Sequence, residues 1–354
     1  MKVKEFGSEY DFRSNEAFLS GAENSFVRHD WQLYRSGRDA IKAFARLAAK
    51  KKALLPALCC ESMIIPFEQN GYTVDFYRMN EDLSCNEADV LNKLDGDTVL
   101  LYMSYYGVPA FSTAFLQSMG ERYPGVLLLE DRTHDILMPV DETAFVPDAV
   151  IASLRKWAAL PDGGMLWTRL GTGEAESDSR YASLRLEAMN KKSRYLNNWD
   201  AELKKACYDE LNAAAEILDE SPVPVKMGAE EEKLLRSIDF EKLTARRVAN
   251  TVLFRKLLRP LADAGKLRFV TDKPERSTLY FPVYLEDNRQ VQAMLAKQGI
   301  YSAVLWPIPP QTQGLCPVTE YVVEHILGIP CDQRCDEEDI RFMAQALTKI
   351  LMEN

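Results

Sequence analysis

Short apolar runs of strand length recur along the first half of the chain, and amphipathic stretches of helical length separate them. Strands joined through helices pair in parallel, and such a sheet needs helices on both of its faces. The pattern therefore predicts an α/β fold built on a mostly parallel, mixed sheet. The runs lie at 53–56, 73–77, 98–103, 126–129 and 149–152, and helical stretches lie at 36–48, 62–70, 87–94 and 113–122.

This alternation fades after about residue 168, and the rest of the chain has a different pattern. Helices are predicted at 180–220, 230–261, 289–298 and 337–352, and strands at 278–285 and 302–306. We therefore expect a large domain over residues 31–225. A smaller α+β domain is expected over residues 226–354, with residues 1–30 joined to it.

Charge and hydropathy exclude several kinds of partner. The chain has 354 residues and a formal net charge of −10. Nucleic acids and anionic membranes attract concentrated positive charge, so neither is expected as a partner. The first nine residues contain no apolar stretch, and no apolar run has membrane-spanning length, so we expect neither a secretory signal nor a membrane segment.

The cysteines indicate a reducing compartment. There are seven, scattered along the chain, and an odd, scattered set fits the cytoplasm better than a disulfide framework. Cys331 and Cys335 have the spacing of half a metal site, but no second Cys or His pair with ligand spacing accompanies them in the sequence. We therefore expect a solvated loop at these two residues, no bound metal, and a cytoplasmic location.

Two of the predicted strands end in residues that carry chemistry. The strand at 149–152 leads to Lys156, and the strand at 126–129 ends at Asp131. In an open parallel sheet, ligands bind beyond the carboxyl ends of the strands. A lysine and an aspartate in this position are what pyridoxal phosphate (PLP) requires. The lysine forms an imine with the cofactor aldehyde, and the carboxylate keeps the pyridine nitrogen protonated.

Three further features accompany this pair. Ser36-Gly37-Arg38 opens a helix after a loop, and the free N–H groups of a helix start can hold a phosphate. His134 follows Asp131 and is a candidate to contact the cofactor ring, and a Gly-Gly-Met segment, 163–165, follows Lys156. Singly, such residues are more often caps, packed histidines or surface lysines. Their order along the chain is what makes the pattern specific.

This order resembles the fold type I PLP enzymes (the aspartate aminotransferase superfamily), and within them most closely the DegT/DnrJ/StrS aminotransferases. The resemblance covers roughly residues 30–170. Its shared segments are Ser36-Gly37-Arg38-Asp39-Ala40 at a helix start, Leu55-Pro56 at a strand end, Tyr106-Gly107 after a strand, Glu130 to His134, and Lys156 followed by Gly163-Gly164-Met165.

The resemblance implies a role for each matching position. Lys156 would form the internal aldimine, Asp131 would hold the pyridine nitrogen, and His134 would lie beside the ring. Cys60 stands where the family often has an aromatic residue stacked on the cofactor, so Tyr105 is a second candidate for stacking. The phosphate would be bound by backbone N–H groups and hydroxyls from Ser36, Gly37, Arg38 and Ser153.

The expected function is a PLP-dependent aminotransferase that moves an amino group from an amino-acid donor to a keto acceptor, a keto sugar being one candidate. Ser153 lies three residues before Lys156, which is nearer the spacing of the class V enzymes. A class V-like lyase or desulfurase, with Cys316 as the loop cysteine, is therefore an alternative, as is a non-catalytic PLP-fold partner protein. Because a second subunit usually completes fold type I sites, the resemblance also implies a homodimer.

Overall fold

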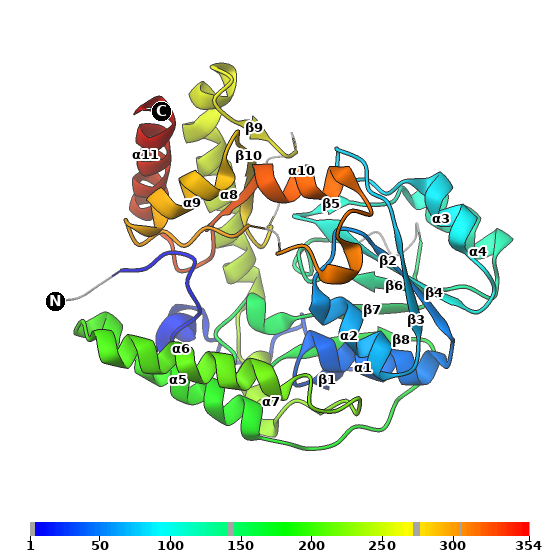
Figure 1. Cartoon of the computed structure of the whole chain (residues 1–354). Helices are drawn as coiled ribbons and strands as arrows, with labels where there is room; N and C mark the ends of the chain where they lie inside the picture. Colours follow the sequence, from blue (N-terminus) through cyan, green and yellow to red (C-terminus); the bar gives the residue numbers. More distant parts are fainter. Residues whose placement is uncertain (1–3, 140–144, 272–276, 305, 354) are drawn as a thin grey trace.

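The computed structural model describes residues 4–139, 145–271, 277–304 and 306–353 (Figure 1). In spatial order the strands of its larger sheet are β1 (Gln32–Tyr34), β8 (Gly164–Thr168), β7 (Ala149–Ala152), β6 (Leu127–Asp131), β4 (Thr98–Tyr105), β2 (Lys52–Pro56) and β3 (Thr73–Tyr77), with the short β5 (Val108–Pro109) paired to β4. From β7 to β3 all neighbours are parallel, whereas β8 runs against both β7 and β1. The predicted α/β class with a mostly parallel, mixed sheet is confirmed.

Four helices of the described structure lie between the strands of this sheet in the sequence, and three of them begin at a polar side-chain cap. They are α1 (Gly37–Ala48), α2 (Glu61–Gln69), α3 (Glu87–Lys93) and α4 (Thr113–Arg122). Ser36, Asn86 and Ser112 each accept a hydrogen bond from the N–H three residues later, which satisfies one of the N–H groups left free at a helix start. Of these helices, α1 contacts β7 and β8, and its first turn lies at the edge of the sheet that carries the candidate site.

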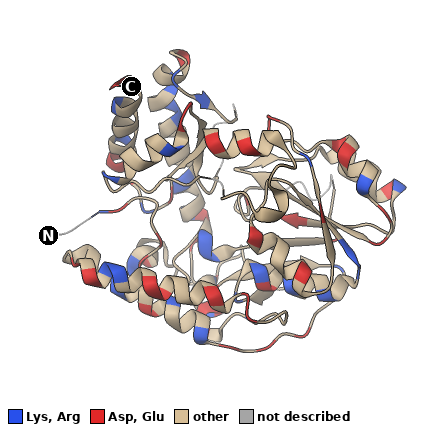
Figure 2. Ribbon diagram, viewed as in Figure 1, with Lys and Arg blue, Asp and Glu red and all other residues tan. Residues whose placement is uncertain are grey.

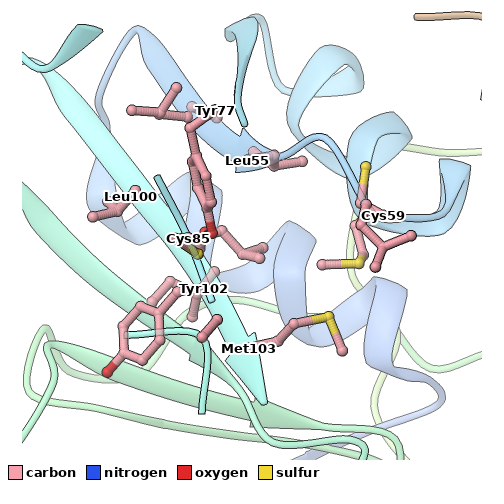
Figure 3. Close-up of a cluster of buried hydrophobic side chains, with 14 of the residues drawn as sticks. Leu55, Cys59, Tyr77, Cys85, Leu100, Tyr102 and Met103 are labelled. Carbon is pink, nitrogen blue, oxygen red and sulfur yellow. Dashed lines mark hydrogen bonds between the residues drawn. The ribbon is translucent and has the colours of Figure 1, made fainter. Parts of the chain in front are cut away.

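The core of the larger sheet explains the apolar runs in its strands. All of β4 is buried, and its residues 99–103 are apolar without alternation. Leu100 and Met103 of β4 belong to one hydrophobic cluster with Leu55 of β2 and Tyr77 of β3 (Figure 3). Because these strands pack into one core, their positions are fixed. The positions of the residues that follow their carboxyl ends are therefore fixed as well.

A smaller antiparallel sheet lies beside the larger one (Figure 1). Its strands are β11 (Ile326–Ile329), β10 (Phe281–Tyr284) and β9 (Arg268–Phe269), and its helices are α8 (Phe240–Asp263), α9 (Asn288–Ala296), α10 (Pro317–His325) and α11 (Glu337–Glu353). It has a hydrophobic core of its own, in which Phe254 of α8 stacks on Phe281 of β10. The smaller α+β part is thus present, while the domain boundary at residues 225 and 226 stays a prediction.

The remaining helices lie elsewhere along the chain. They are α5 (Arg180–Asn197), α6 (Ala201–Ile217) and α7 (Ala229–Arg236), together with the 3₁₀ helices η1 (Phe12–Phe18), η2 (Leu154–Lys156) and η3 (Pro310–Thr312). Helices α5 and α6 are paired, and both carry positive and negative side chains (Figure 2). In the described segments no helix is both long enough and apolar enough to cross a membrane.

Two of the predicted elements in the smaller part are wrong. Residues 302–306 do not form a strand in the described structure: Ala303 makes one antiparallel bridge with Gly328, and the prolines that begin at Pro307 cannot donate to a ladder. The single helix predicted over 230–261 is two helices, α7 and α8. Between them Ile238 pairs with Leu19, and this pairing takes the backbone out of the helical path.

The predicted loop at Cys331 and Cys335 is present, but the expectation that it is solvated is wrong. Both side chains are buried in the core of the smaller part, and the Asn250 side-chain amide donates to both of their carbonyl oxygens. The segment is therefore a packed turn held by a buried amide. The residues that the structure describes contain no group of three His, Cys, Asp or Glu side chains able to hold a metal ion.

Candidate active site

A cleft at the carboxyl edge of the larger sheet contains most of the residues singled out from the sequence. Its cavity volume is about 110 Å³. Asp131 ends β6, and Lys156 lies in η2, just after the neighbouring parallel strand β7. The predicted residues that line the cleft are Ser36, Gly37, Arg38, Cys60, Asp131, His134, Ser153 and Lys156.

The Gly-Gly pair after Lys156 positions the start of α1. The Gly163 N–H donates to the Arg35 carbonyl at 2.9 Å, and Gly163 has a φ of 139°. A Cβ on Gly164 would overlap the Ser36 carbonyl. Only glycine allows two backbones to approach this closely, so the pair lets β8 begin directly against the residue that caps α1.

A buried ion pair holds the first turn of α1. Arg35 donates twice to the Asp39 carboxylate, both times at 2.9 Å, and the Ser36 hydroxyl donates to the same carboxylate at 2.6 Å. The Ser36 oxygen accepts from the Asp39 N–H. The N–H groups of Gly37 and Arg38 have no acceptor within the described residues. They are the free donors of a helix start, and an anion in the cleft can use them.

Ser153 lies beside this helix start. A Cβ built on Gly37 would be 3.3 Å from the Ser153 Cβ, which places the serine against the first turn of α1. Arg38 differs from its neighbours because its guanidinium forms an ion pair with Asp219. Because its guanidinium is already paired, the backbone N–H of Arg38 is the donor that is left for an anion.

Asp131 is buried and is bound by Thr133. Its Oδ1 accepts from the Thr133 N–H at 2.8 Å. Burial raises the pKa of the Asp131 carboxyl, and the Thr133 side chain, the Thr133 N–H and the positive charge of Lys156 act against that rise. A cation placed next to the carboxyl would favour its ionised form further.

His134 is buried and uncharged near neutral pH. Burial, together with the charge of Lys156, lowers the pKa of its ring to about 3. Its Nδ1 accepts from the Tyr106 N–H at 3.4 Å, and its ring lies 5.5 Å from the Trp306 ring at a tilt of 32°. The imidazole is therefore a neutral, flat wall of the cleft.

Lys156 has a free amine. Within the part of the chain that the structure describes, its Nζ makes no hydrogen bond and no ion pair. Removal from water lowers the pKa of this amine below its ordinary value of 10.5, and the charge of Arg155 acts in the same direction. Tyr10 fixes the backbone that follows, because its hydroxyl donates to the Trp157 carbonyl at 3.2 Å.

Two candidate ring-stacking residues occupy different places. Cys60 lines the cleft as the N-cap of α2, and its sulfur lies 2.8 Å from the Ser62 hydroxyl oxygen. Tyr105 is fully buried outside the cleft lining, and its hydroxyl donates to the Leu58 carbonyl. The structure thus brings Cys60 to the site and leaves Tyr105 in the core between β2 and β4.

Thr133 is a site residue that the sequence did not indicate. Its N–H binds Asp131, its hydroxyl accepts from the Ser153 N–H at 3.0 Å, and its carbonyl accepts from the Trp157 indole at 2.8 Å. One residue therefore connects the segments before and after Lys156 to the end of β6. Its place between Asp131 and His134 was the only available signal.

The groups that line the cleft match the groups of PLP in kind and in position. A phosphate would find the free N–H groups at the start of α1, and a protonated ring nitrogen would find the buried carboxylate of Asp131. An aldehyde would find the unpaired amine of Lys156. His134 offers a neutral flat surface to a ring between these ends.

Comparison with known proteins identifies the fold. No family model matches the sequence, and no curated protein matches it either. Among solved structures, aminotransferase TlmJ from Streptoalloteichus hindustanus matches with a TM-score of 0.66 and 16% identity, over 99% of each chain. Helicobacter pylori PseC, an aminotransferase involved in the biosynthesis of pseudoaminic acid, matches with a TM-score of 0.64 and 15% identity, over 99% of this chain and 100% of that chain. The chain has the aminotransferase fold.

A third match has the same architecture. The putative sugar aminotransferase Spr1654 from Streptococcus pneumoniae, in its PLP form, matches with a TM-score of 0.64 and 12% identity, over 100% of this chain and 99% of that chain. Near-complete coverage on both sides means that the larger and the smaller part both have counterparts. The predicted fold type I architecture is therefore confirmed along the whole described chain.

Proposed function

We propose that the chain is a PLP-dependent aminotransferase that moves an amino group from an amino-acid donor to a keto acceptor. The observation that carries the proposal is the convergence of three groups in one cleft. These are the free Lys156 amine, the buried Asp131 carboxyl and the free N–H groups of Gly37 and Arg38. A keto sugar is the proposed class of acceptor, because Spr1654 is described as a putative sugar aminotransferase.

The fold neighbours also support the choice of cofactor. Spr1654 has been solved in a PLP form and in a PMP form, and NtdA from Bacillus subtilis with bound PMP. The first two are the aldehyde and amine forms of one cofactor. Interconversion of these forms is what a transaminase carries out in each half of its reaction.

When bound, PLP supplies an electron sink for the substrate carbon. Asp131 would hold the proton on the ring nitrogen through its carboxylate. Lys156 Nζ would take the proton from the substrate carbon and deliver it again, which its lowered pKa favours near neutral pH. Gly37 and Arg38 would anchor the phosphate end, and His134, being neutral, would bound the ring without adding charge.

The position of Cys316 argues against the desulfurase alternative. A desulfurase needs a mobile nucleophilic cysteine beside the cofactor. Cys316 is buried in the core of the larger part, with its sulfur directed at the Met79 carbonyl at 3.7 Å. It does not line the cleft. Transamination is therefore the better supported reaction.

We further propose a homodimer that works in a reducing compartment such as the cytoplasm. All seven cysteines are free thiols, which suits such a compartment. The dimer rests on the resemblance to fold type I enzymes, whose sites a second subunit usually completes. Sedimentation of the PLP-loaded protein should give twice the mass of one chain. A monomer with full PLP binding would contradict the dimer and leave the activity open to test.

A single-turnover experiment tests the activity. The protein is loaded with PLP, freed of excess cofactor and mixed with glutamate. We expect loss of the PLP absorption, one equivalent of 2-oxoglutarate, and recovery of the absorption when a keto acid is added. Release of ammonia or sulfide from an amino acid, with the PLP absorption unchanged at the end, would instead assign a lyase.

A further inference from the structure

Arg155 is an unpaired cation in the wall of the cleft. It lies in η2 between Ser153 and Lys156, and its backbone N–H donates to the Gly163 carbonyl at 3.3 Å. Its side chain lines the cleft, and its Nε is buried with no hydrogen-bond partner. Among the residues that the structure describes, no acceptor and no carboxylate lies within bonding distance of its guanidinium.

Three other arginines near the site are paired with carboxylates, and Arg155 differs from them in this respect. Arg35 is bound to Asp39, Arg38 to Asp219, and Arg185 to Glu9. Leaving a buried guanidinium N–H without an acceptor is unfavourable, and such a group in a folded protein calls for an explanation. An anion that enters the cleft can supply the missing acceptor.

The surroundings of Arg155 indicate which anion this is. The phosphate position at the start of α1 has its own donors, and the cation there, Arg38, is held by Asp219. Arg155 instead acts electrostatically on Lys156 and on Glu9, the residue before Tyr10. Glu9 is bound by Arg185 and forms no ion pair with Arg155 in the described structure. The Arg155 side chain lines the same cleft as Lys156, where an amine substrate has to bind.

We propose that Arg155 binds the carboxylate of the amino-acid donor and so selects amino acids over simple amines at Lys156. This inference rests on the proposed function. A guanidinium presents two parallel N–H groups that match the two oxygens of a carboxylate, which fixes orientation as well as charge. The donor's amino group is then held near the Lys156 amine, while its carboxylate satisfies the buried Nε.

The test uses glutarate, a dicarboxylate that has no amino group and cannot react. Its binding is measured by calorimetry, with and without PLP, to wild type, Arg155→Gln and Arg155→Lys. Exposed Arg122→Gln of α4 is the matched control. We expect Arg155→Gln to weaken glutarate binding at least about tenfold, Arg155→Lys to weaken it less, and Arg122→Gln to leave it unchanged. Equal binding by wild type and Arg155→Gln overturns the proposal.

A second arm separates the substrate carboxylate from the cofactor phosphate. PLP and pyridoxal, which lacks the phosphate, are titrated into the same variants. We expect both affinities to be unchanged in Arg155→Gln. A loss confined to PLP, with glutarate binding retained, would assign Arg155 to the phosphate and overturn the proposal. If wild type does not take up PLP, the proposed function fails, yet glutarate binding that depends on Arg155 would still support a carboxylate site.

Discussion

Gly164 and Ser36 are in such close backbone contact that no Cβ fits on the glycine. An added Cβ would overlap the Ser36 carbonyl carbon and oxygen and come within 2.7 Å of the Gly37 nitrogen. Ser36 caps α1, and the free N–H groups of that helix start are the proposed phosphate site. The glycine that follows the candidate lysine therefore determines where the other end of the cofactor is held.

Gly164→Ala should displace the start of α1. We expect a loss of about 1 to 3 kcal/mol in the free energy of unfolding, since the rigid backbone on the other side of the contact must move. PLP affinity should fall at least about tenfold, because the donors of the first turn shift with it. Denaturant unfolding and a fluorescence titration with PLP measure the two effects.

Gly120→Ala is the matched control for this substitution. Gly120 lies in α4, and a Cβ there meets nothing within 4 Å. It should stabilise the protein by about 0.5 to 1 kcal/mol through helix propensity, with PLP binding unchanged. Equal PLP affinity in Gly164→Ala and Gly120→Ala would disprove the link between β8 and the phosphate site.

Most of the fold could be predicted from the sequence because the large sheet is regular. Its inner strand β4 is buried along its whole length, and helices α1 and α4 begin at the polar caps Ser36 and Ser112, so these elements carry local signals. The failures depend on distant partners. Ile238 leaves the helical path because it pairs with Leu19, and Ala303 pairs with Gly328 for a single bridge.

Asp131→Asn should still bind PLP but should react with glutamate much more slowly. The amide is similar in size and can still accept from Thr133, but it cannot keep the ring nitrogen protonated. We expect the single-turnover rate with glutamate to fall by about 10²- to 10³-fold. The neighbouring Glu130→Gln removes a carboxyl outside the cleft lining and should leave this rate unchanged. A rate for Asp131→Asn within a few-fold of wild type would remove Asp131 from the proposed role.

Asp162 should make stability depend on pH. Its Oδ2 accepts from the Gly228 N–H, and burial raises the pKa of the carboxyl from 3.8 to about 8. Between these values the folded protein holds a proton that the unfolded chain has released, so the contribution of Asp162 to stability decreases as pH rises through this window. Asp162→Asn removes the titration and retains the acceptor. It should therefore gain stability relative to wild type from pH 4 to pH 8.

Denaturant midpoints of wild type and Asp162→Asn at several pH values measure this effect. Asp209→Asn, in an exposed ion pair with Lys205, is the control and should differ little from wild type at any pH. A difference between wild type and Asp162→Asn that stays constant from pH 4 to pH 8 would show that Asp162 ionises freely in the folded protein.

The candidate site could be predicted only at residues whose positions follow from the order of strands along the sequence. Asp131 and Lys156 follow adjacent parallel strands, and strand ends can be recognised in a sequence. The separation of Tyr105 from the cleft could not be predicted, because it depends on a hydrogen bond to the distant Leu58 carbonyl. The role proposed for Arg155 could not be predicted either, because only the packed structure reveals that its Nε has no partner among the described residues.

Chemical trapping on Lys156 tests the proposed function most directly. The protein is incubated with PLP, reduced with borohydride and digested, and the modified peptide is identified by mass spectrometry. We predict one phosphopyridoxyl group per chain, on Lys156, and none in Lys156→Ala, which should keep its fold. A stable modification on a different lysine, or equal modification of Lys156→Ala, would contradict the assignment of this cleft as a PLP site.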